Sequence, residues 1–327
     1  MRAIVNTEPG KLELQERPAP QPGRGQVRIA TAACGICATD LVMIAGWERT
    51  HCPAIPGHEW SGVVDAVGEG VDGQWLGKRV VGENVLSDGG EVGFEHPGGY
   101  AERFLTEADR LHPLPDDLPL ELAALIEPLA VSVRGFKRLG EDAAGPALIL
   151  GDGPVGLIFA RLLGDRERKP SLVGGREERL QAARKLGATK TWNYHTCESE
   201  FEPAVREQLG PEFPTIVEAS GSSAALAAAM DLVAECGRIL VLGDYGQDRA
   251  EFRWNHLLWR QIRLIGSNAS ADAWPEAVAL AAGDRDLLET LITHRLPAEA
   301  FAEAVRLAKD RRSGAIKVVL QWASDPC

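Results

Sequence analysis

The sequence predicts an α/β protein with two domains, one rich in β-strands and one built on a doubly wound parallel sheet. Its length of 327 residues exceeds what one hydrophobic core usually serves. Residues 1 to about 120 read as short strands separated by turns, which is typical of β-rich folds. From about residue 120 onward, helices alternate with apolar strands, the pattern of a parallel sheet covered on both faces.

Short strands are expected in the N-terminal part of the chain. Residues 27–31 alternate between apolar and polar side chains, residues 61–67 are mostly apolar, and residues 101–105 follow the turn at Gly98-Gly99. Alternating or short apolar runs bounded by turns indicate strands.

The second half of the chain favours βαβ units. An apolar run at 147–150 predicts a strand, and residues 155–163 continue as an apolar helix. We further expect strands at 171–173, 215–217 and 238–242, helices at 179–186 and 223–233, and, after about residue 265, two or three helices and a last strand at 316–320.

Charge and composition exclude several classes of function. The 35 basic and 47 acidic residues give a formal net charge of −12, so neither nucleic acid nor an anionic membrane is an expected partner. No apolar run is long enough to span a bilayer, and the start of the chain lacks the apolar core of a secretion signal. Six cysteines are too few for a disulfide framework in a chain of this size. We therefore expect a cytoplasmic location.

Three short segments far apart in the chain carry residues that could ligate one metal ion. They are Cys34-Gly35-Ile36-Cys37-Ala38-Thr39-Asp40, Gly57-His58-Glu59 and Ile126-Glu127-Pro128. Zinc binds thiolate, imidazole and carboxylate, and a catalytic zinc keeps three protein ligands and one open position. Cys37 and His58, together with either Glu59 or Glu127, meet that count.

Two residues next to this cysteine suit supporting roles. The Thr39 hydroxyl could carry the proton of an alcohol away, and Asp40 could hold the imidazole of a ligand in one tautomer. Each candidate also has a structural interpretation. Cys34 and Cys37 could be buried small side chains or a redox pair, and the histidine or the distant glutamate could be structural. Their joint occurrence with a glycine-rich turn favours the metal site.

The glycine-rich turn is Gly151-Asp152-Gly153-Pro154-Val155-Gly156, between an expected strand and an expected helix. In this context the first glycine permits a tight turn, the second lets the backbone approach a pyrophosphate, and the third lets helix and strand pack closely. The pyrophosphate would lie against free N–H groups at the start of the helix. The alternative is a bend between strand and helix that binds no ligand.

The end of the next strand bears on the choice of cofactor. A site that prefers NAD usually has an acidic residue there, about 20 residues on, to bind the ribose hydroxyls. Here Val173-Gly174 is followed by Gly175, which leaves room, and by Arg176, which could pair with a 2′-phosphate. This favours NADP. The alternative is NAD, with Glu177 or Glu178 in the ribose role and the arginine solvated.

Taken in order, these segments resemble the zinc-dependent medium-chain dehydrogenase/reductases of the alcohol dehydrogenase superfamily, and among them the sorbitol and threonine dehydrogenase branch. The likeness runs nearly from end to end. It is carried by residues 34–40, 57–59, 125–129 and 151–156, by Val217-Glu218-Ala219-Ser220-Gly221, and by Thr293-His294-Arg295. The resemblance implies a GroES-like β-rich catalytic domain of residues 1–121 and 266–327, and a Rossmann dinucleotide-binding domain of residues 122–265.

The resemblance also assigns the metal ligands. Cys37, and not Cys34, matches the zinc-binding cysteine of the family, and His58 matches its histidine. Glu59 and Glu127 match carboxylates that share or exchange the remaining position in this branch. Which of the two is the third ligand stays open.

Catalytic and cofactor-binding roles carry over in the same way. Thr39 matches the hydroxyl that contacts the substrate oxygen, and with Asp40 and Glu59 it completes the expected catalytic set. The expected cofactor-binding residues are Gly151, Gly153, Pro154, Val155, Gly156, Gly175, Arg176, Ser267, Asn268 and Lys317, of which the lysine matches a basic residue that meets the pyrophosphate.

The chain departs from the family pattern in two places. Many relatives carry a lobe with four cysteines that binds a structural zinc, whereas residues 83–99 here are short and contain no cysteine. We therefore expect one catalytic zinc and no structural zinc, in a homo-oligomer that could be a dimer or a tetramer. Val42 stands where some relatives have a histidine that relays the proton, so the proton would leave through Thr39 with the cofactor ribose or water, or through His51.

The sequence thus predicts a zinc-dependent oxidoreductase that transfers hydride between a secondary alcohol or polyol, or the matching ketone, and a nicotinamide cofactor. Trp47, Arg49 and His51 lie in a region that often lines the pocket in relatives, although Trp47 could equally be a core residue. One alternative is a zinc-free NADPH-dependent reductase of quinones or activated double bonds. Another is a non-catalytic binding protein on the same scaffold.

Overall fold

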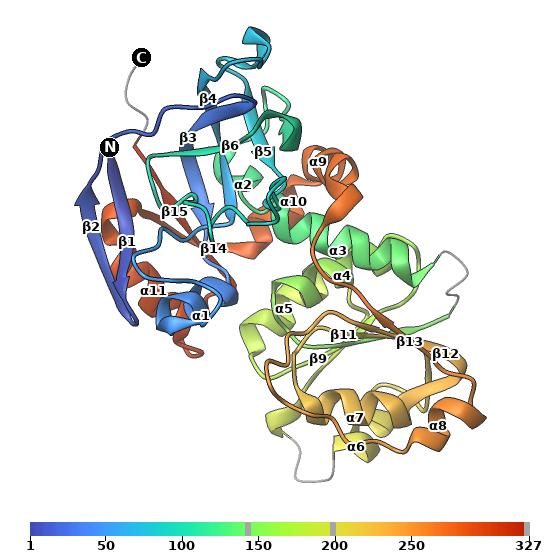
Figure 1. Cartoon of the computed structure of the whole chain (residues 1–327). Coiled ribbons are helices and arrows are strands. Elements are labelled where there is room, and N and C mark those ends of the chain that lie inside the picture. The colour runs from blue at the N-terminus through green and yellow to red at the C-terminus, as the bar shows by residue number, and fades with distance from the viewer. Residues whose placement is uncertain (141–144, 197–200, 324–327) are drawn as a thin grey trace. The chain divides into compact units, whose positions relative to one another are not determined.

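The computed structural model describes residues 1–140, 145–196 and 201–323, and these form two compact units (Figure 1). The first unit joins both ends of the chain, Met1–Ala130 and Ala271–Cys327, and the second unit is Val131–Ser270. Along the chain, the first boundary between the units falls within helix α3 (Ile126–Leu139). The limits of the units therefore differ from the domain limits expected after residues 121 and 265. Those domain limits remain our proposal.

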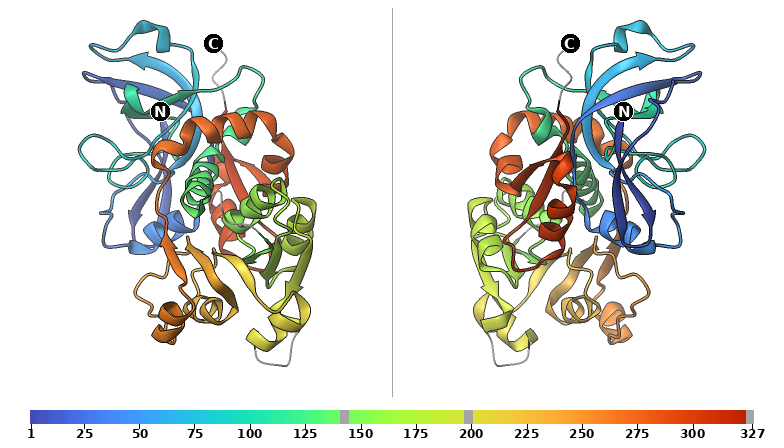
Figure 2. Two further views of the ribbon diagram at one scale, coloured as in Figure 1. Left: turned by 90° about the vertical axis from the view of Figure 1, so that its right-hand side faces the viewer. Right: turned by 90° about the vertical axis from the view of Figure 1, so that its left-hand side faces the viewer.

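The first unit is built on a β-sheet whose strand order is β14-β15-β3-β4-β5-β7, with β6 paired to β3. A separate hairpin is formed by β1 and β2. The strands are β1 (Arg2–Glu8), β2 (Lys11–Glu16), β3 (Gln26–Gly35), β4 (Glu59–Val67), β5 (Arg79–Gly82), β6 (Arg103–Glu107), β7 (Leu111–Pro113), β14 (Ile292–Pro297) and β15 (Lys317–Gln321). The C-terminal strand β15 pairs antiparallel with β3, and Figure 2 shows the red C-terminal segment beside the blue N-terminal segment.

Alternating burial explains these strands. In β3, Val27 and Ile29 are fully buried and pack in one core with Trp60 and Phe104, whose rings meet edge to face. The expected strands at 27–31 and 61–67 therefore lie within β3 and β4. The expectation at 101–105 was wrong by two residues, because Ala101 makes only an isolated bridge to Ala3 and the strand begins at Arg103.

Short helices complete the first unit. They are α1 (Ala38–Gly46), α2 (Leu120–Ala123), α9 (Trp274–Gly283), α10 (Arg285–Leu291) and α11 (Phe301–Lys309). The last three confirm the helices expected after residue 265. The N-terminal hairpin and the strands β5, β7 and β14 were not expected from the sequence pattern. Among the described residues, no helix has the length and apolar character needed to traverse a lipid bilayer.

The second unit is a parallel sheet with the strand order β10-β9-β8-β11-β12-β13. Counted along the chain this is 3-2-1-4-5-6, the order of a doubly wound dinucleotide-binding sheet. The strands are β8 (Ala147–Leu150), β9 (Ser171–Gly174), β10 (Lys190–Asn193), β11 (Phe213–Glu218), β12 (Val233–Val241) and β13 (Arg263–Gly266). The helices are α4 (Pro154–Gly164), α5 (Glu177–Lys185), α6 (Phe201–Gln208), α7 (Ser223–Leu232) and α8 (Trp254–Trp259).

Helices lie on both faces of this sheet, with α4 and α5 on one side and α6 to α8 on the other (Figure 1). Strand β8 is buried throughout, as expected for a central parallel strand. The α/β fold class, with a β-rich unit and a doubly wound parallel sheet, is therefore confirmed.

Candidate metal centre and nucleotide-binding turn

Strand register brings the candidate ligands of the first unit together. At the end of β3, Gly35 pairs with Glu59 of β4 on one side and with Val319 of β15 on the other. The chain then continues through Ile36, whose N–H donates to the carbonyl of Val318 over 2.9 Å, to Cys37. Three segments that are distant in sequence thus meet at one end of the neighbouring strands β15, β3 and β4.

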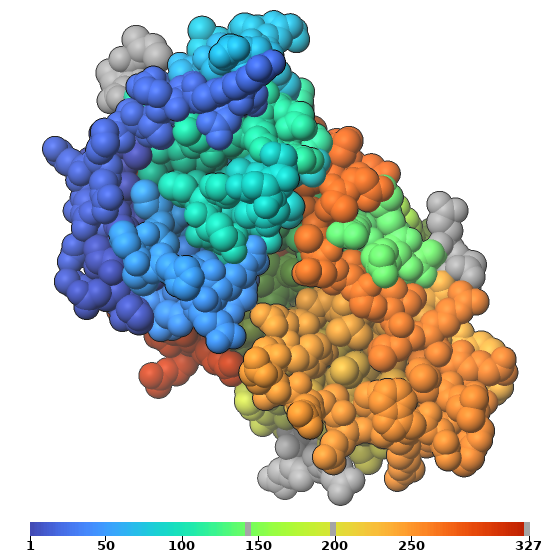
Figure 3. All heavy atoms as spheres, viewed as in Figure 1, coloured from blue at the N-terminus to red at the C-terminus, as the bar shows by residue number. Residues whose placement is uncertain are grey.

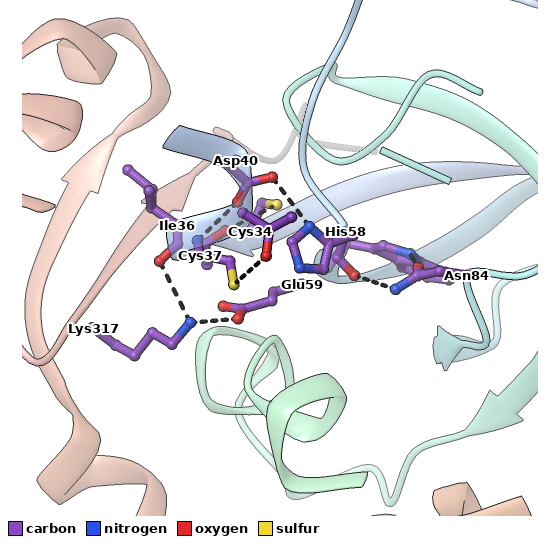
Figure 4. Close-up of polar contacts among 11 residues, drawn as sticks. Cys34, Ile36, Cys37, Asp40, His58, Glu59, Asn84 and Lys317 are labelled. Carbon is purple, nitrogen blue, oxygen red and sulfur yellow. Dashed lines mark hydrogen bonds and ion pairs between the residues drawn. The ribbon is translucent and has the colours of Figure 1, made fainter. Parts of the chain in front are cut away.

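The resulting cluster contains Cys37, His58 and Glu59, and ligand atoms of these three residues all lie within 4.8 Å of one another (Figure 4). His58 and Glu59 are buried, and Cys37 is partly exposed. A sulfur, an imidazole nitrogen and a carboxylate oxygen are the donors that zinc accepts. Within the described ranges, Glu127 is not part of this set.

Asp40 holds two members of the cluster in place. Its fully buried carboxylate accepts a hydrogen bond from the Cys37 N–H at 2.8 Å, at the start of α1, and its other oxygen lies 3.1 Å from His58 Nδ1. We assign the ring proton to Nδ1, which leaves Nε2 as the donor atom for a ligand. Burial lowers the pKa of His58, but the Asp40 charge and hydrogen bond outweigh burial and raise this pKa well above its usual value.

The Thr39 hydroxyl lies beside the cluster, with its oxygen 3.6 Å from the sulfur of Cys37. Both residues are in the first turn of α1 or directly before it. The hydroxyl is therefore close enough to reach an oxygen atom held next to the sulfur.

Glu59 carries the feature that fits a metal ion best. Its Oε1 accepts a hydrogen bond from Lys317 Nζ, whereas Oε2 is buried and has no hydrogen-bond partner among the residues that the structure describes. A buried carboxylate oxygen without a partner is costly, and a cation at the cluster would satisfy it. The observed donor set therefore fits zinc.

Lys317 was expected to meet the cofactor pyrophosphate, and the structure places its ammonium group against the cluster. Nζ contacts Glu59 and lies 3.4 Å from the carbonyl of Ile36, and the side chain is buried. Burial lowers the pKa of Lys317, but the charge of Glu59 outweighs burial and raises it. The partnership with Glu59 was not foreseen, because it depends on the pairing of β15 with β3.

Glycines stand at two positions next to the cluster where a side chain would not fit. A Cβ added at Gly35 would lie 2.3 Å from Glu59 Oε2, so a side chain there would displace the carboxylate. Gly57 precedes His58 with φ +104°, and a Cβ there would lie 2.8 Å from the sulfur of Cys34. Only glycine adopts this backbone conformation without strain.

Glu127, the alternative third ligand, is in the first turn of α3 and is half-buried. Burial raises its pKa to about 7, with the charge of His58 opposing the shift and that of Glu59 adding to it. The carboxyl group is thus near enough to feel the cluster electrostatically, although its oxygens lie outside the close set. Which of Glu59 and Glu127 is the third ligand therefore stays open.

The predicted pocket region is tied to the cluster through an aromatic ring that the sequence did not single out. The ring centroid of Phe94 lies 4.9 Å from that of His58, and the guanidinium carbon of Arg49 lies 4.9 Å from the Phe94 centroid. Arg49 donates to Glu91 at 2.7 Å and to Glu95 at 2.6 and 3.0 Å.

Both partners of Arg49 belong to the segment 83–99, in which the sequence analysis predicted no helix, strand or site residue. Two further candidates for the pocket or for proton exit lie close by. Trp47 meets Phe94 edge to face at 6.1 Å, and His51 is exposed and lines a 320 Å³ hollow together with Arg49 and Phe94. Val42 has an aliphatic side chain and therefore contributes no proton-relay group.

In the second unit, the glycine turn joins β8 to α4, and its three glycines have three different surroundings. Gly151 has φ +116°, and a Cβ on it would lie 2.9 Å from the backbone of Ala219. A Cβ on Gly153 would meet nothing within 4 Å, whereas one on Gly156 would lie 2.1 Å from the carbonyl of Gly151. The first and third glycines are thus required by the fold, and the second leaves an open approach to the backbone.

Helix α4 begins directly after Gly153, with Pro154 at its first position and Val155 next. Proline suits this place because its missing N–H would have no partner inside the helix. The remaining N–H groups of the first turn point out of the helix start, which is the usual place for a phosphate.

The tip of β9 contains an ion pair that the sequence did not reveal. Asp152, inside the glycine turn, accepts hydrogen bonds from the N–H groups of Gly175 and Arg176, both at 3.0 Å, and pairs with the Arg176 guanidinium. Burial raises the pKa of Asp152, but Arg176 outweighs it and holds the pKa below its usual value. A Cβ on Gly175 would lie 2.7 Å from the Tyr194 hydroxyl and 2.9 Å from His195 Nε2.

Ser267 and Asn268 follow β13. The Ser267 N–H donates to the carbonyl of Val241 at 3.1 Å, and its buried hydroxyl has no hydrogen-bond partner within the described part of the chain. The carbonyl of Asn268 accepts a hydrogen bond from Arg134. Both residues therefore lie past the carboxyl ends of β12 and β13, the edge at which ligands bind in open parallel sheets.

Comparison with known proteins adds family models and relatives to this geometry. Residues 23–116 match the alcohol dehydrogenase GroES-like domain, and residues 154–283 match the zinc-binding dehydrogenase domain. An L-threonine 3-dehydrogenase of Anaeromyxobacter sp. (strain Fw109-5) is 30% identical over 99% of this chain and 100% of its own length. The sorbitol dehydrogenase of Halalkalibacterium halodurans is 27% identical over 98% of this chain and 99% of its own length.

A solved structure extends the likeness to three dimensions. The alcohol dehydrogenase rspB from E. coli CFT073, crystallised with NADH, superposes with a TM-score of 0.90. It is 26% identical and covers 98% of this chain and 99% of its own.

Proposed function

The chain belongs to the zinc-dependent medium-chain dehydrogenase/reductase family, in the sorbitol and threonine dehydrogenase branch, and on that premise we propose a function for the site. The protein is an alcohol or polyol dehydrogenase that transfers hydride between a secondary alcohol, or the matching ketone, and a nicotinamide cofactor. The observation that carries the proposal is the close set of Cys37, His58 and Glu59, whose ligand atoms lie within 4.8 Å of one another.

Residues of the first unit have distinct roles in this reaction. Zinc, when bound by Cys37, His58 and Glu59 or Glu127, supplies Lewis-acid chemistry that makes an alcohol proton easier to remove. Thr39 hydrogen-bonds the substrate oxygen and relays its proton by passing its own hydroxyl proton to the cofactor ribose or to water, since its hydroxyl is 3.6 Å from the sulfur of Cys37. Asp40 keeps His58 in the tautomer whose Nε2 can act as a ligand.

The substrate is an uncharged alcohol or polyol. Arg49, the cation of the predicted pocket region, already donates to the carboxylates of Glu91 and Glu95. Its charge is therefore neutralised within the protein, which disfavours a role in binding a phosphate or carboxylate group of the substrate.

The cofactor is NADP, held by the glycine turn and by the tip of β9. Arg176 supplies a cation at the tip, and Gly175 lets the Tyr194 hydroxyl and the His195 imidazole approach the backbone there. Asp152, the acid in contact with the tip, is engaged by N–H donors and is not free to bind ribose hydroxyls. The cysteine-free segment 83–99 supports one zinc per chain, with no structural zinc.

The assembly is a homo-oligomer, in which the apolar surface around α8 is the proposed contact. Trp254, Leu258 and Trp259 are each 69% exposed, and Leu264 on the edge strand β13 is 42% exposed. Figure 3 shows this orange segment at the surface of the second unit. Exposed edges and apolar patches of this kind favour association, which light scattering of the purified chain would measure. The cysteines that the structure describes, at 34, 37, 52 and 236, are free, which supports a reducing cytoplasmic location.

The experiment that tests the proposal combines metal analysis with a substrate screen. We expect one zinc per chain, oxidation of polyols or secondary alcohols with NADP, and loss of activity after chelation that added zinc restores. A metal-free chain that reduces quinones with NADPH would contradict the proposal in favour of a zinc-free reductase. Failure to bind either dinucleotide in a fluorescence titration would instead favour a non-catalytic protein.

A further inference from the structure

We propose that Asp152 is a positioning residue for the 2′-phosphate of the cofactor, and that it acts by holding the guanidinium of Arg176. The inference rests on the NADP preference proposed above and adds a second residue to it. Asp152 occupies the variable position between the first two glycines of the nucleotide turn, where the turn itself requires no acid.

The carboxylate of Asp152 is almost completely enclosed. Its side chain is 5% exposed, and it accepts hydrogen bonds from two backbone N–H groups, those of Gly175 and Arg176. A Cβ on Gly174 would lie 2.5 Å from Asp152 Cβ and 2.7 Å from Oδ2, so the glycine there makes room for the acid. These contacts fix the carboxylate against the tip of β9.

The fixed carboxylate in turn orients the arginine. Arg176 Nε lies 3.2 Å from both Asp152 oxygens, and Nη2 donates to Oδ1. These bonds use one edge of the planar guanidinium, so the edge formed by Nη1 and Nη2 stays turned away from the carboxylate. An arginine held in this way loses less side-chain entropy when it binds a phosphate than a solvated arginine does.

A second arginine adjoins the pair. Arg179 Nη1 lies 3.3 Å from the backbone carbonyl of Asp152. Tyr194 and His195 stand on the other side of Gly175 and offer a hydroxyl and an imidazole. The groups around the tip are therefore suited to an anion.

A direct role of Asp152 in binding ribose hydroxyls is disfavoured by the same contacts. Both carboxylate oxygens already accept hydrogen bonds from N–H donors of Gly175 and Arg176. A ribose diol would have to displace these donors and leave them unpaired in a buried place, which is costly.

The test is a fluorescence titration of the full-length protein with NADPH and with NADH, for the wild type and the variants Asp152→Ala, Asp152→Asn and Arg176→Gln. We expect the ratio of the two Kd values to shift toward NADH by about tenfold in Asp152→Ala, while the Kd for NADH changes less than about threefold. A tenfold change equals about 1.4 kcal/mol. The double variant Asp152→Ala/Arg176→Gln should shift the ratio no further than Arg176→Gln does. Asp165→Ala, which removes an exposed acid at the other end of α4, is the matched control and should leave the ratio unchanged.

Two results would overturn the inference, and they differ from each other. If the wild type binds NADH more tightly than NADPH, the proposed cofactor preference fails and the inference fails with it. If the wild type prefers NADPH but Asp152→Ala weakens both dinucleotides equally, the preference stands and Asp152 is only a structural support of the turn. Asp152→Asn, which keeps an acceptor oxygen for the backbone N–H groups, should retain the fold and still shift the ratio.

Discussion

The candidate metal centre and the nucleotide turn are built in opposite ways. The metal centre takes Cys37 from the junction of β3 and α1, His58 and Glu59 from the start of β4, and Lys317 from β15, so it exists only because these strands pair in one register. The nucleotide turn is six consecutive residues, of which three join β8 to α4 and three form the first turn of α4. The first site depends on the sheet that assembles it, whereas the second is specified locally.

The difference predicts how each site tolerates change. A slip of one residue between β3 and β4 would move Glu59 away from Gly35 and turn its side chain to the other face of the sheet. In the nucleotide turn, each glycine can be altered separately, and the surroundings of its Cβ indicate whether the fold or the ligand is affected. Substitutions in the two sites therefore sharpen the contrast.

The largest effect is expected for Cys37→Ser. A serine hydroxyl is a far weaker zinc ligand than a thiolate, so the variant should lose its metal and its turnover, measured by metal analysis and by alcohol oxidation. Cys34→Ser is the matched control. The Cys34 thiol is fully buried, and burial raises its pKa well above the usual value, so it stays protonated and should not ligate. Full activity in both variants would show that the site is misplaced.

A smaller effect is expected for Asp40→Asn. The asparagine oxygen can still accept the Cys37 N–H, but its NH2 group would face His58 Nδ1 and favour the tautomer that protonates Nε2. Metal affinity should fall about 10- to 100-fold, as for other changes to groups that orient a ligand. Competition with a chromogenic chelator measures this affinity. An unchanged affinity would mean that Asp40 serves only as the cap of α1.

The same contrast explains what the sequence could predict. The turn at 151–156, the strand before it and the helix after it were all predicted, because a local pattern of glycines and apolar residues determines them. The strands of the first unit were predicted only in part: β1, β2, β5, β7 and β14 were missed, and β6 was placed two residues early. Short strands with partners distant in sequence leave a weak periodic signal.

The site residues divide along the same line. Local sequence motifs indicated Cys37, His58 and Glu59 as candidate ligands. The contact of Lys317 with Glu59 instead follows from the pairing of β15 with β3, which no local motif indicates. The salt bridge between Asp152 and Arg176 likewise joins the ends of two adjacent strands, β8 and β9. Such partners become visible only when register is known.

The smallest effect on stability is expected for Gly153→Ala, which should act mainly on the affinity for the dinucleotide. A methyl group there meets no protein atom within 4 Å, so the free energy of unfolding should change by less than about 0.5 kcal/mol. The methyl group would instead occupy the space through which a pyrophosphate approaches the backbone, and the Kd for the dinucleotide should rise about tenfold. Gly156→Ala is the reciprocal variant: its Cβ would lie 2.1 Å from the carbonyl of Gly151, so it should destabilise the protein by about 1–3 kcal/mol. Chemical denaturation and fluorescence titration of both variants would separate the two effects, and equal cofactor affinity in Gly153→Ala and the wild type would mean that no ligand closely approaches the turn.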